Sequence, residues 1–412
     1  MTPAAALPTQ RTADADVIAD LLATPPAPPL RREQAQSLAD GAAGTALLHI
    51  ERALTGTGRW DTAHRWLRAA VHHGVLATID ASLYRGAPAV AFTLHTAAAG
   101  HTDRYTTARK AVDRAVTALA HRRIDQAQRR IACAELPTMA EFDVICGLTG
   151  IGAHLLHHLP DNEALPRILA YLVRLTEPLH HDGDTIPGWW VRHDPHATTT
   201  TAFPGGHANF GLAHGITGPL ALLALAKRRG ITVDNHLDAI ERINAWLDTW
   251  RQHDDTGTWW PQWITHQERR TGRPAQTGPG RPSWCYGTPG IARTQQLAAL
   301  ATSDLNRQQL AEQALATCLA DPRQLARIGD LSLCHGWAGL LATAQRAAVD
   351  ATTVGLASHL SHIADQLLRH TATLTQLGDG LLEGRAGVAL ALSTAGAGAP
   401  PQSGWDACLL IA

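Results

Sequence analysis

Two cysteines and a histidine stand beside glycine pairs that recur along the chain. Cys334 and His335 directly precede a Gly-x-x-Gly in "LSLCHGWAGL", and Cys285 lies two residues before Gly287 in "SWCYGTPG". Thiolate sulfur and imidazole nitrogen are preferred zinc ligands. No fourth Cys or His stands at an equivalent position, and three protein ligands with one open place are typical of catalytic zinc. The alternative is that the cysteines are small buried hydrophobes.

Four other polar residues near these glycines suggest acid–base chemistry. His214 directly precedes a glycine and could act as acid or base near neutral pH, or be a histidine bonded to the backbone. Asp143, in "EFDVICGLTG", could orient an imidazole, although an Asp there is more often a helix cap. Arg281, in "GRPSWCYG", could hold a carbonyl or an enolate, or lie on the surface. Tyr286, next to Cys285, is a further candidate for proton transfer.

The elements that must position these residues form a repeat. A glycine followed by an apolar, alanine-rich run occurs seven times, and in six of the seven the frame is Gly-x-x-Gly. Amphipathic stretches such as "LDAIERINAWLDTW" separate the runs, with apolar residues at three- and four-residue steps that predict helices with one buried stripe. The first glycines of the seven units are Gly41, Gly86, Gly147, Gly215, Gly287, Gly336 and Gly384.

The repeat predicts an all-α fold, a seven-fold α/α toroid with an inner and an outer layer of helices. A single helix pair cannot bury its apolar face, so neighbouring pairs must stack. An open helical solenoid is the alternative, but recurring glycines favour closure, because small residues let converging helix ends approach. All inner helices then point their N-termini, each with a partial positive charge, toward one mouth.

Closure would bring the two cysteines together. Cys285 and Cys334 stand at equivalent positions of consecutive repeats, and neighbouring inner helices lie about 8–10 Å apart. Side chains that lean toward each other can share a metal with Zn–S bonds of about 2.3 Å, and His335 can supply the third ligand.

Composition limits the remaining choices. The formal net charge of −1 gives no electrostatic reason to expect nucleic acid. Six cysteines in 412 residues favour a reducing compartment, and neither a signal peptide nor a membrane span is evident, so we expect a cytoplasmic protein.

The composition of residues 1–30, with "ATPPAPPL", predicts a Pro/Ala-rich N-terminal arm, and residues 31–412 are expected to form the toroid with its zinc site. Residues 251–283 predict a long functional loop.

The motifs "AHGITG", "SWCYGTPG", "LCHGWAG" and "LLEGRAGVALAL" closely resemble those of the lanthipeptide synthetase C-like (LanC) cyclases. The resemblance covers nearly the whole chain from about residue 30. It implies a seven-fold α/α barrel with one zinc ion held by Cys285, Cys334 and His335. The family's active-site Asp, His, Arg and Tyr fall on Asp143, His214, Arg281 and Tyr286.

The resemblance also implies a reaction and partners. A cysteine of a dehydrated precursor peptide, made of leader and core, binds the zinc as thiolate and adds to dehydroalanine or dehydrobutyrine. His214 acts as the acid or the base, and the product is a lanthionine or methyllanthionine ring of a lanthipeptide antibiotic. As a free-standing cyclase the protein would work beside a separate dehydratase and an exporter, in the cytoplasm or at the inner face of the membrane.

Two other functions stay open at this point. One is a LanC-like protein that binds glutathione or a peptide thiol without adding it to anything. The other is a zinc-thiolate alkyltransferase on a similar toroid, resembling protein prenyltransferase β-subunits. The Cys-Cys-His set argues against the second, because those enzymes typically use a carboxylate among their zinc ligands.

Overall fold

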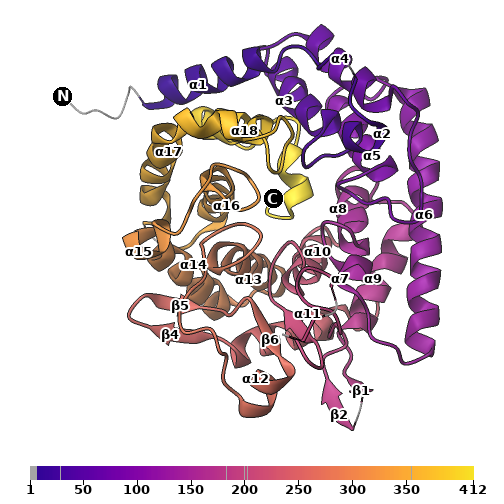
Figure 1. Cartoon of the computed structure of the whole chain (residues 1–412), viewed down its shortest axis with the longest axis vertical. Helices are drawn as coiled ribbons and strands as arrows, with labels where there is room; N and C mark the ends of the chain where they lie inside the picture. The colour runs from indigo at the N-terminus through magenta and orange to yellow at the C-terminus, as the bar shows by residue number, and fades with distance from the viewer. Residues whose placement is uncertain (1–6, 28, 182, 199, 202, 354) are drawn as a thin grey trace.

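The computed structural model describes residues 7–412 except 28, 182, 199, 202 and 354. Within these residues, seven helices form an inner ring (Figure 1). Each begins one or two residues after one of the repeat glycines, as predicted. They are α3 (Ala42–Leu54), α5 (Ala87–Ala97), α8 (Leu148–His158), α10 (Thr217–Arg228), α13 (Thr288–Thr302), α16 (Trp337–Asp350) and α18 (Arg385–Ala397).

The inner ring is closed. Each inner helix contacts the next along the chain, and α18 contacts α3 to complete the circle. Every residue of α5 is buried, as expected for a helix surrounded by others on all sides. The prediction of a closed α/α toroid is therefore confirmed, and the open solenoid is excluded.

A second layer of helices covers the ring. Each packs mainly on one inner helix and buries one stripe, as α4 does with Ala63, Trp66, Leu67 and Ala70. In order from the partner of α3 to the partner of α18, the outer helices are α4 (Trp60–Val71), α6 (Thr106–Ala132), α9 (Ala164–Leu175), α11 (His236–Thr249), α14 (Leu305–Ala320), α17 (His359–Arg369) and α1 (Leu7–Leu21).

The last outer helix corrects the expectation for the N-terminus. Within the predicted Pro/Ala-rich arm of residues 1–30, α1 packs on α18 and contacts α17, so the first helix of the described residues completes the final pair. Ala15, Ile18, Ala19 and Leu22 lie at helical spacing and are all buried. Residues 1–6 lie outside the described residues, and a domain boundary at residue 30 stays a prediction.

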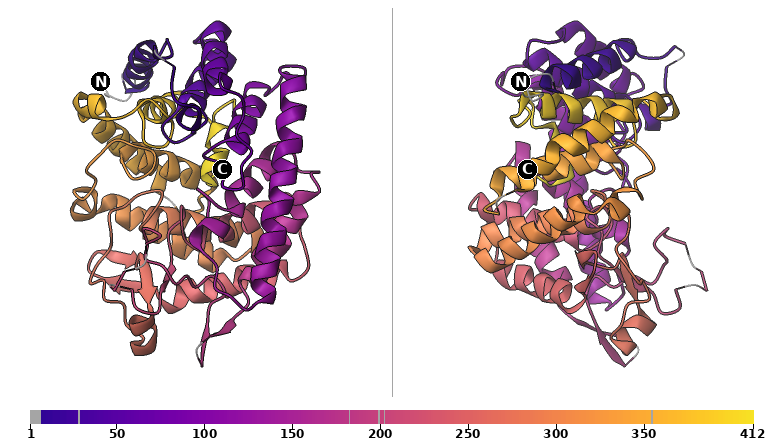
Figure 2. Two further views of the ribbon diagram at one scale, coloured as in Figure 1. Left: turned by 45° about the vertical axis from the view of Figure 1, so that its right-hand side comes forward. Right: turned by 90° about the vertical axis from the view of Figure 1, so that its left-hand side faces the viewer.

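Short elements decorate the mouth and the rim. The predicted loop 251–283 holds two hairpin strands, a third strand and a short helix, and the β1–β2 hairpin projects from the edge of the ring (Figure 2). All pairs are antiparallel: β1 (Leu179–His181) with β2 (Asp184–Ile186), β3 (His207–Asn209) with β6 (Trp263–Thr265), and β4 (Gln252–Asp254) with β5 (Gly257–Trp259). The remaining short helices are α2 (Arg32–Ala35), α7 (Met139–Phe142), α12 (His266–Thr271), α15 (Pro322–Leu325), η2 (Leu356–Ser358), η3 (Thr371–Gln376) and η4 (Trp405–Leu409).

The C-terminal segment fills the centre of the ring (Figure 1). Cys408, Leu409 and Ile411 are fully buried. Their carbonyl oxygens accept hydrogen bonds from Tyr84, Trp284 and Arg293, which lie in or just before inner helices. The centre of the ring is therefore a packed core.

Candidate active site

Backbone hydrogen bonds tie the loops that enter the inner helices to one another. The peptide N–H of Cys285 donates to Cys334 O at 3.1 Å, and that of Cys334 donates to Leu382 O at 2.9 Å. The same pattern links further neighbouring loops around the mouth, as in Leu212 to Cys285, Val144 to Ala213 and Leu382 to Ala39. Equivalent positions of adjacent repeats are thus held side by side, and this holds Cys285 beside Cys334.

The second glycine of each frame fixes the cysteines further. A Cβ atom at Gly290 would lie 2.2 Å from the carbonyl oxygen of Trp284, and one at Gly339 would lie 2.0 Å from that of Leu333. Trp284 and Leu333 directly precede the two cysteines. Only glycine lets each loop lie so close to its own helix, so the frame sets the position of the residue that carries the thiol.

The structure gathers the three candidate ligands into one cluster. One donor atom each of Cys285, Cys334 and His335 lies within 4.8 Å of the others. Tetrahedral zinc with Zn–S bonds of about 2.3 Å separates two sulfurs by about 3.8 Å, which fits this spacing. Cys285 is buried, while Cys334 and His335 are half-buried at the mouth. The cluster can therefore be reached by a ligand from solvent.

Asp330 holds the histidine of this cluster. Its Oδ2 lies 3.1 Å from His335 Nε2, which leaves Nδ1 as the candidate donor to a metal. Its Oδ1 accepts a hydrogen bond from the N–H of Ser332, and the Ser332 hydroxyl accepts one from the His335 N–H. A carboxylate on the outer nitrogen of a ligating histidine is the usual support of such sites. Asp330 was not among the residues predicted from the sequence.

Hydrogen bonds among the three donors set their pKa values in the metal-free protein. The hydrogen bond from Cys334 holds the pKa of Cys285 well below its usual range, and the same bond raises the pKa of Cys334. A hydrogen bond with the Cys285 sulfur raises the pKa of His335. A metal ion bound by these donors would displace the protons of Cys334 and His335, so its binding would release protons. Two soft sulfurs with one imidazole nitrogen are a donor set that zinc prefers.

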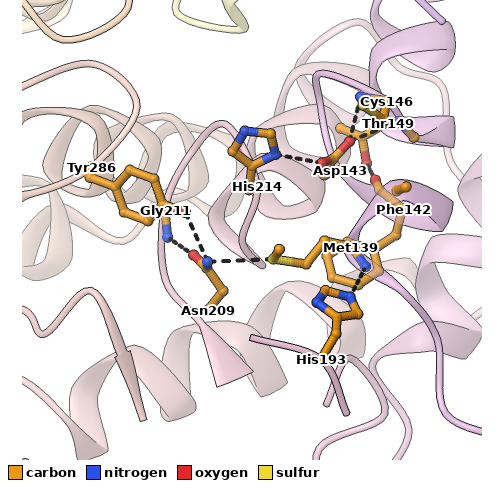
Figure 3. A network of polar contacts seen from close by, with 12 residues as sticks. Met139, Phe142, Asp143, Cys146, Thr149, His193, Asn209, Gly211, His214 and Tyr286 are labelled. Carbon is orange, nitrogen blue, oxygen red and sulfur yellow. Dashed lines mark hydrogen bonds and ion pairs between the residues drawn. The ribbon is translucent and has the colours of Figure 1, made fainter. Parts of the chain in front are cut away.

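A second pair stands at the same mouth: Asp143 and His214 (Figure 3). Asp143 is 1% exposed. Its Oδ1 accepts hydrogen bonds from the N–H groups of Cys146 and Gly147 at 2.6 and 2.8 Å, and its Oδ2 lies 2.7 Å from His214 Nδ1. The residue is thus both the cap and the partner of an imidazole, the two alternatives that the sequence left open.

The carboxylate changes the acidity of the imidazole. Burial lowers the pKa of His214, but the hydrogen bond and the charge of Asp143, with a smaller effect from Cys285, outweigh it, and the net shift is upward. Because Asp143 holds Nδ1, Nε2 is the nitrogen that can exchange a proton with a substrate. About 36% of the His214 side chain is exposed, so a peptide can reach it.

Tyr286 is held by a residue that the sequence analysis did not single out. Its hydroxyl accepts a hydrogen bond from Asn209 Nδ2 at 2.9 Å, and Asn209 Oδ1 accepts one from the N–H of Gly211 (Figure 3). Asn209 ends β3, which pairs with β6 of the inserted loop. Burial raises the pKa of Tyr286 to about 12, so the phenol keeps its proton and can donate it in a hydrogen bond.

Arg281 is half-buried and lies near the cysteine cluster. Its proximity shows in its electrostatic effect. The hydrogen bond with Cys285 has the largest effect on the pKa values of Cys334 and His335, and it raises both. The positive charge of Arg281 has a smaller effect and lowers both pKa values. All seven candidate residues of the sequence analysis therefore lie on loops at one mouth, though no hydrogen bond joins Arg281 to the others in the described part of the chain.

A closed ring of paired helices with a Cys-Cys-His cluster and an aspartate-held histidine at one mouth defines an α/α toroid with a candidate metal-dependent active site. Among the described residues, no helix combines the length and apolar character needed to cross a membrane.

Residues 32–410 match the family described as lanthionine synthetase C-like protein, and the chain belongs to that family. It is 25% identical over 262 residues to the nisin biosynthesis protein NisC of Lactococcus lactis subsp. lactis. That alignment spans 62% of this chain and 61% of the relative, less than two thirds of its length. The structure named nisin cyclase is similar in fold, with a TM-score of 0.78, 21% identity, and coverage of 98% of this chain and 96% of the other.

Proposed function

We propose that the protein is a lanthionine cyclase. It adds the thiol of a peptide cysteine to a dehydroalanine or dehydrobutyrine of the same dehydrated peptide and forms a lanthionine or methyllanthionine thioether. The observation that carries the proposal is the Cys285–Cys334–His335 cluster at the same mouth as the Asp143–His214 pair. Membership of the family and similarity to a nisin biosynthesis protein support it.

Cys285, Cys334 and His335 would hold one zinc ion per chain. A zinc ion held there would supply an open position at which a peptide thiol binds with a strongly lowered pKa. Asp330 keeps the His335 ring in place for this task. The buried Cys285 and the Gly290 contact behind it give the cluster a rigid base.

The other residues at the mouth handle the proton and the charge. In the addition a C–S bond forms at the β-carbon, the C=C π pair moves toward the carbonyl, and the proton that leaves the thiol is balanced by one added at the α-carbon. His214 Nε2 takes or gives that proton, and Asp143 holds the ring so that Nε2 faces outward. Arg281 and the protonated Tyr286 are donors for the oxygen that becomes negative.

The chemistry also indicates partners and location. The substrate must come from a dehydratase that converts serine or threonine of a precursor peptide, with leader and core, to the unsaturated residues. The cyclised peptide would then pass to an exporter, which would place the reaction in the cytoplasm or at the inner face of the membrane. A reducing compartment agrees with the six cysteines, none of which is in a disulfide.

The test uses a synthetic peptide with one dehydroalanine and one cysteine. Cyclisation leaves the mass unchanged and removes the free thiol, so labelling with a maleimide followed by mass spectrometry measures it. We expect the zinc-loaded protein to consume the thiol and His214→Asn to do so 10²–10⁴-fold more slowly, with unchanged zinc content.

The matched control is His362→Asn, which replaces an exposed histidine on α17, away from the mouth. This variant should behave as the original protein. Peptide that binds but keeps its thiol would contradict the proposal and identify a thiol-binding protein. Loss of zinc in His214→Asn would make His214 a ligand and refute its role in proton transfer.

A further inference from the structure

Three histidines meet toward the other end of the inner helices, away from the mouth. His95 lies near the C-terminal end of α5, and His154 and His158 lie one turn apart on α8, the neighbouring inner helix. The ring centroids are 5.6 Å apart for His95 and His154, 5.3 Å for His95 and His158, and 5.5 Å for His154 and His158. The rings thus form a nearly equilateral triangle.

Three buried nitrogen atoms of this triangle have no hydrogen-bond partner. His154 is fully buried, and neither of its ring nitrogens has a hydrogen-bond partner. The buried Nε2 of His158 also has none. Buried polar atoms in native proteins are almost always paired, and an ion held among the rings would give these three imidazole nitrogens a common partner.

The protonation state suits a cation. Burial lowers the pKa of His154 to about 3 and that of His158 well below its usual range, so both rings are neutral at physiological pH. A neutral imidazole offers a lone pair, as metal binding requires. The carbonyl ends of α5 and α8, which carry negative partial charge, lie on this side of the ring and favour a positive ion.

The third histidine has the support that ligating histidines usually have. Nε2 of His95 lies 2.8 Å from Oδ1 of Asp113, which comes from the outer helix α6. A carboxylate on the outer nitrogen fixes the ring and makes the other nitrogen a better donor. Phe92 packs edge-on against His158, with centroids 5.1 Å apart, and supplies an apolar wall.

We propose that His95, His154 and His158 form a second metal site, which binds a divalent transition-metal ion through three imidazoles. Imidazole nitrogens suit zinc, copper, iron and nickel ions, and Co²⁺ can occupy the same kind of site. Three imidazoles bound to one tetrahedral ion through bonds of about 2.0–2.1 Å have ring centroids about 5 Å apart, close to the spacing of this triangle.

Binding requires the rings to turn. Among the described residues, only the donors of Cys285, Cys334 and His335 already lie within 4.8 Å of one another. The torsion that has to change is the terminal one of each imidazole, which has broad wells. The ion would join α5 and α8 directly and α6 through Asp113, and would hold the long outer helix against the ring. The proposal is independent of the reaction at the mouth.

A titration of the metal-free protein with Co²⁺ tests it. One equivalent at the cysteine cluster gives sulfur-to-metal charge-transfer absorption, whereas a site of imidazoles gives only weaker visible bands. We expect two equivalents to bind, one of each spectral type. His154→Leu keeps the buried volume and removes the unpaired nitrogens, so it should fold and lose only the equivalent without charge transfer.

Further variants make the result decisive. His158→Gln, at a less buried position, should lose the same equivalent, and Asp113→Asn should weaken its binding by roughly 10–100-fold. His157→Gln is the matched control, because this neighbour on α8 pairs with Arg229 and lies outside the triangle. A single equivalent in the original protein would overturn the proposal. A second equivalent that persists in both His154→Leu and His158→Gln would overturn it as well.

Discussion

Asp143→Asn separates the charge of the carboxylate from its role as a cap. The amide oxygen can still accept the hydrogen bonds from Cys146 and Gly147, so the loop before α8 should keep its structure. The amide NH₂, however, replaces the oxygen that lies 2.7 Å from His214 Nδ1. Two donors cannot face each other, so Nδ1 must lose its proton, and the imidazolium is no longer stabilised.

The size of the effect follows from the bond that is lost. A hydrogen bond to a charged group contributes about 1.5–3 kcal/mol, and each 1.36 kcal/mol corresponds to a factor of ten in rate. Because about a third of the His214 side chain is exposed, solvent weakens the pair. We therefore expect cyclisation to slow roughly ten- to fiftyfold, less than in His214→Asn, with zinc content and unfolding temperature unchanged.

The pH dependence of the rate, followed by thiol labelling, reveals which role His214 plays. Asp143 raises the pKa of His214, so its removal moves the titration of the imidazole to lower pH. If His214 is the base, the limb on which the rate rises with pH moves to lower pH. If His214 is the acid, the limb on which the rate falls with rising pH also moves to lower pH. An unchanged rate and pH profile in Asp143→Asn would refute the coupling between Asp143 and His214. Asp143→Ala also loses the cap of α8, so it should unfold at a lower temperature than Asp143→Asn.

Three further predictions concern the remaining residues of the mouth. Cys334→Ala should lose its zinc in metal analysis while circular dichroism keeps the helical signal; full zinc content would refute the ligand assignment. Asp330→Asn should weaken zinc binding roughly 10–100-fold in competition with a chelator, since it holds His335, whereas an unchanged affinity would remove Asp330 from the site. Tyr286→Phe keeps the ring and loses the donor, so the cyclisation rate should fall with unchanged peptide affinity; a normal rate would show that Arg281 suffices for the oxygen.

Much of the site could be predicted from the sequence, because the glycine repeat shows which residues occupy equivalent positions around the ring. Each glycine frame marks the start of an inner helix, so residues with the same offset from a glycine lie at the same height around the ring. Cys285 and Cys334 share an offset in consecutive repeats, and the hydrogen bond between their loops shows why that places them side by side.

Residues outside the repeat pattern could not be placed in this way. Asp330 lies five residues before its partner His335, in the same repeat. Asp143 and its partner His214, in contrast, come from two different repeats. The two carboxylate–imidazole pairs therefore share no common spacing in the sequence. Asn209 reaches Tyr286 only because β3 pairs with a strand of the inserted loop, a non-local contact without a signal in either segment. Helix α1 did have a signal. Ala15, Ile18, Ala19 and Leu22 form a helical stripe, which the proline-rich stretch that follows obscured.

The pairing of α1 with α18 has a consequence for the order of folding. The two helices are nearly the whole chain apart in sequence, so the seam between them has the highest contact order in the molecule. During synthesis α1 leaves the ribosome early and must wait, with Ile18 uncovered, until α18 has been made. The α1–α18 pair therefore forms last, and until then the apolar stripe of α1 is a surface that a chaperone can bind.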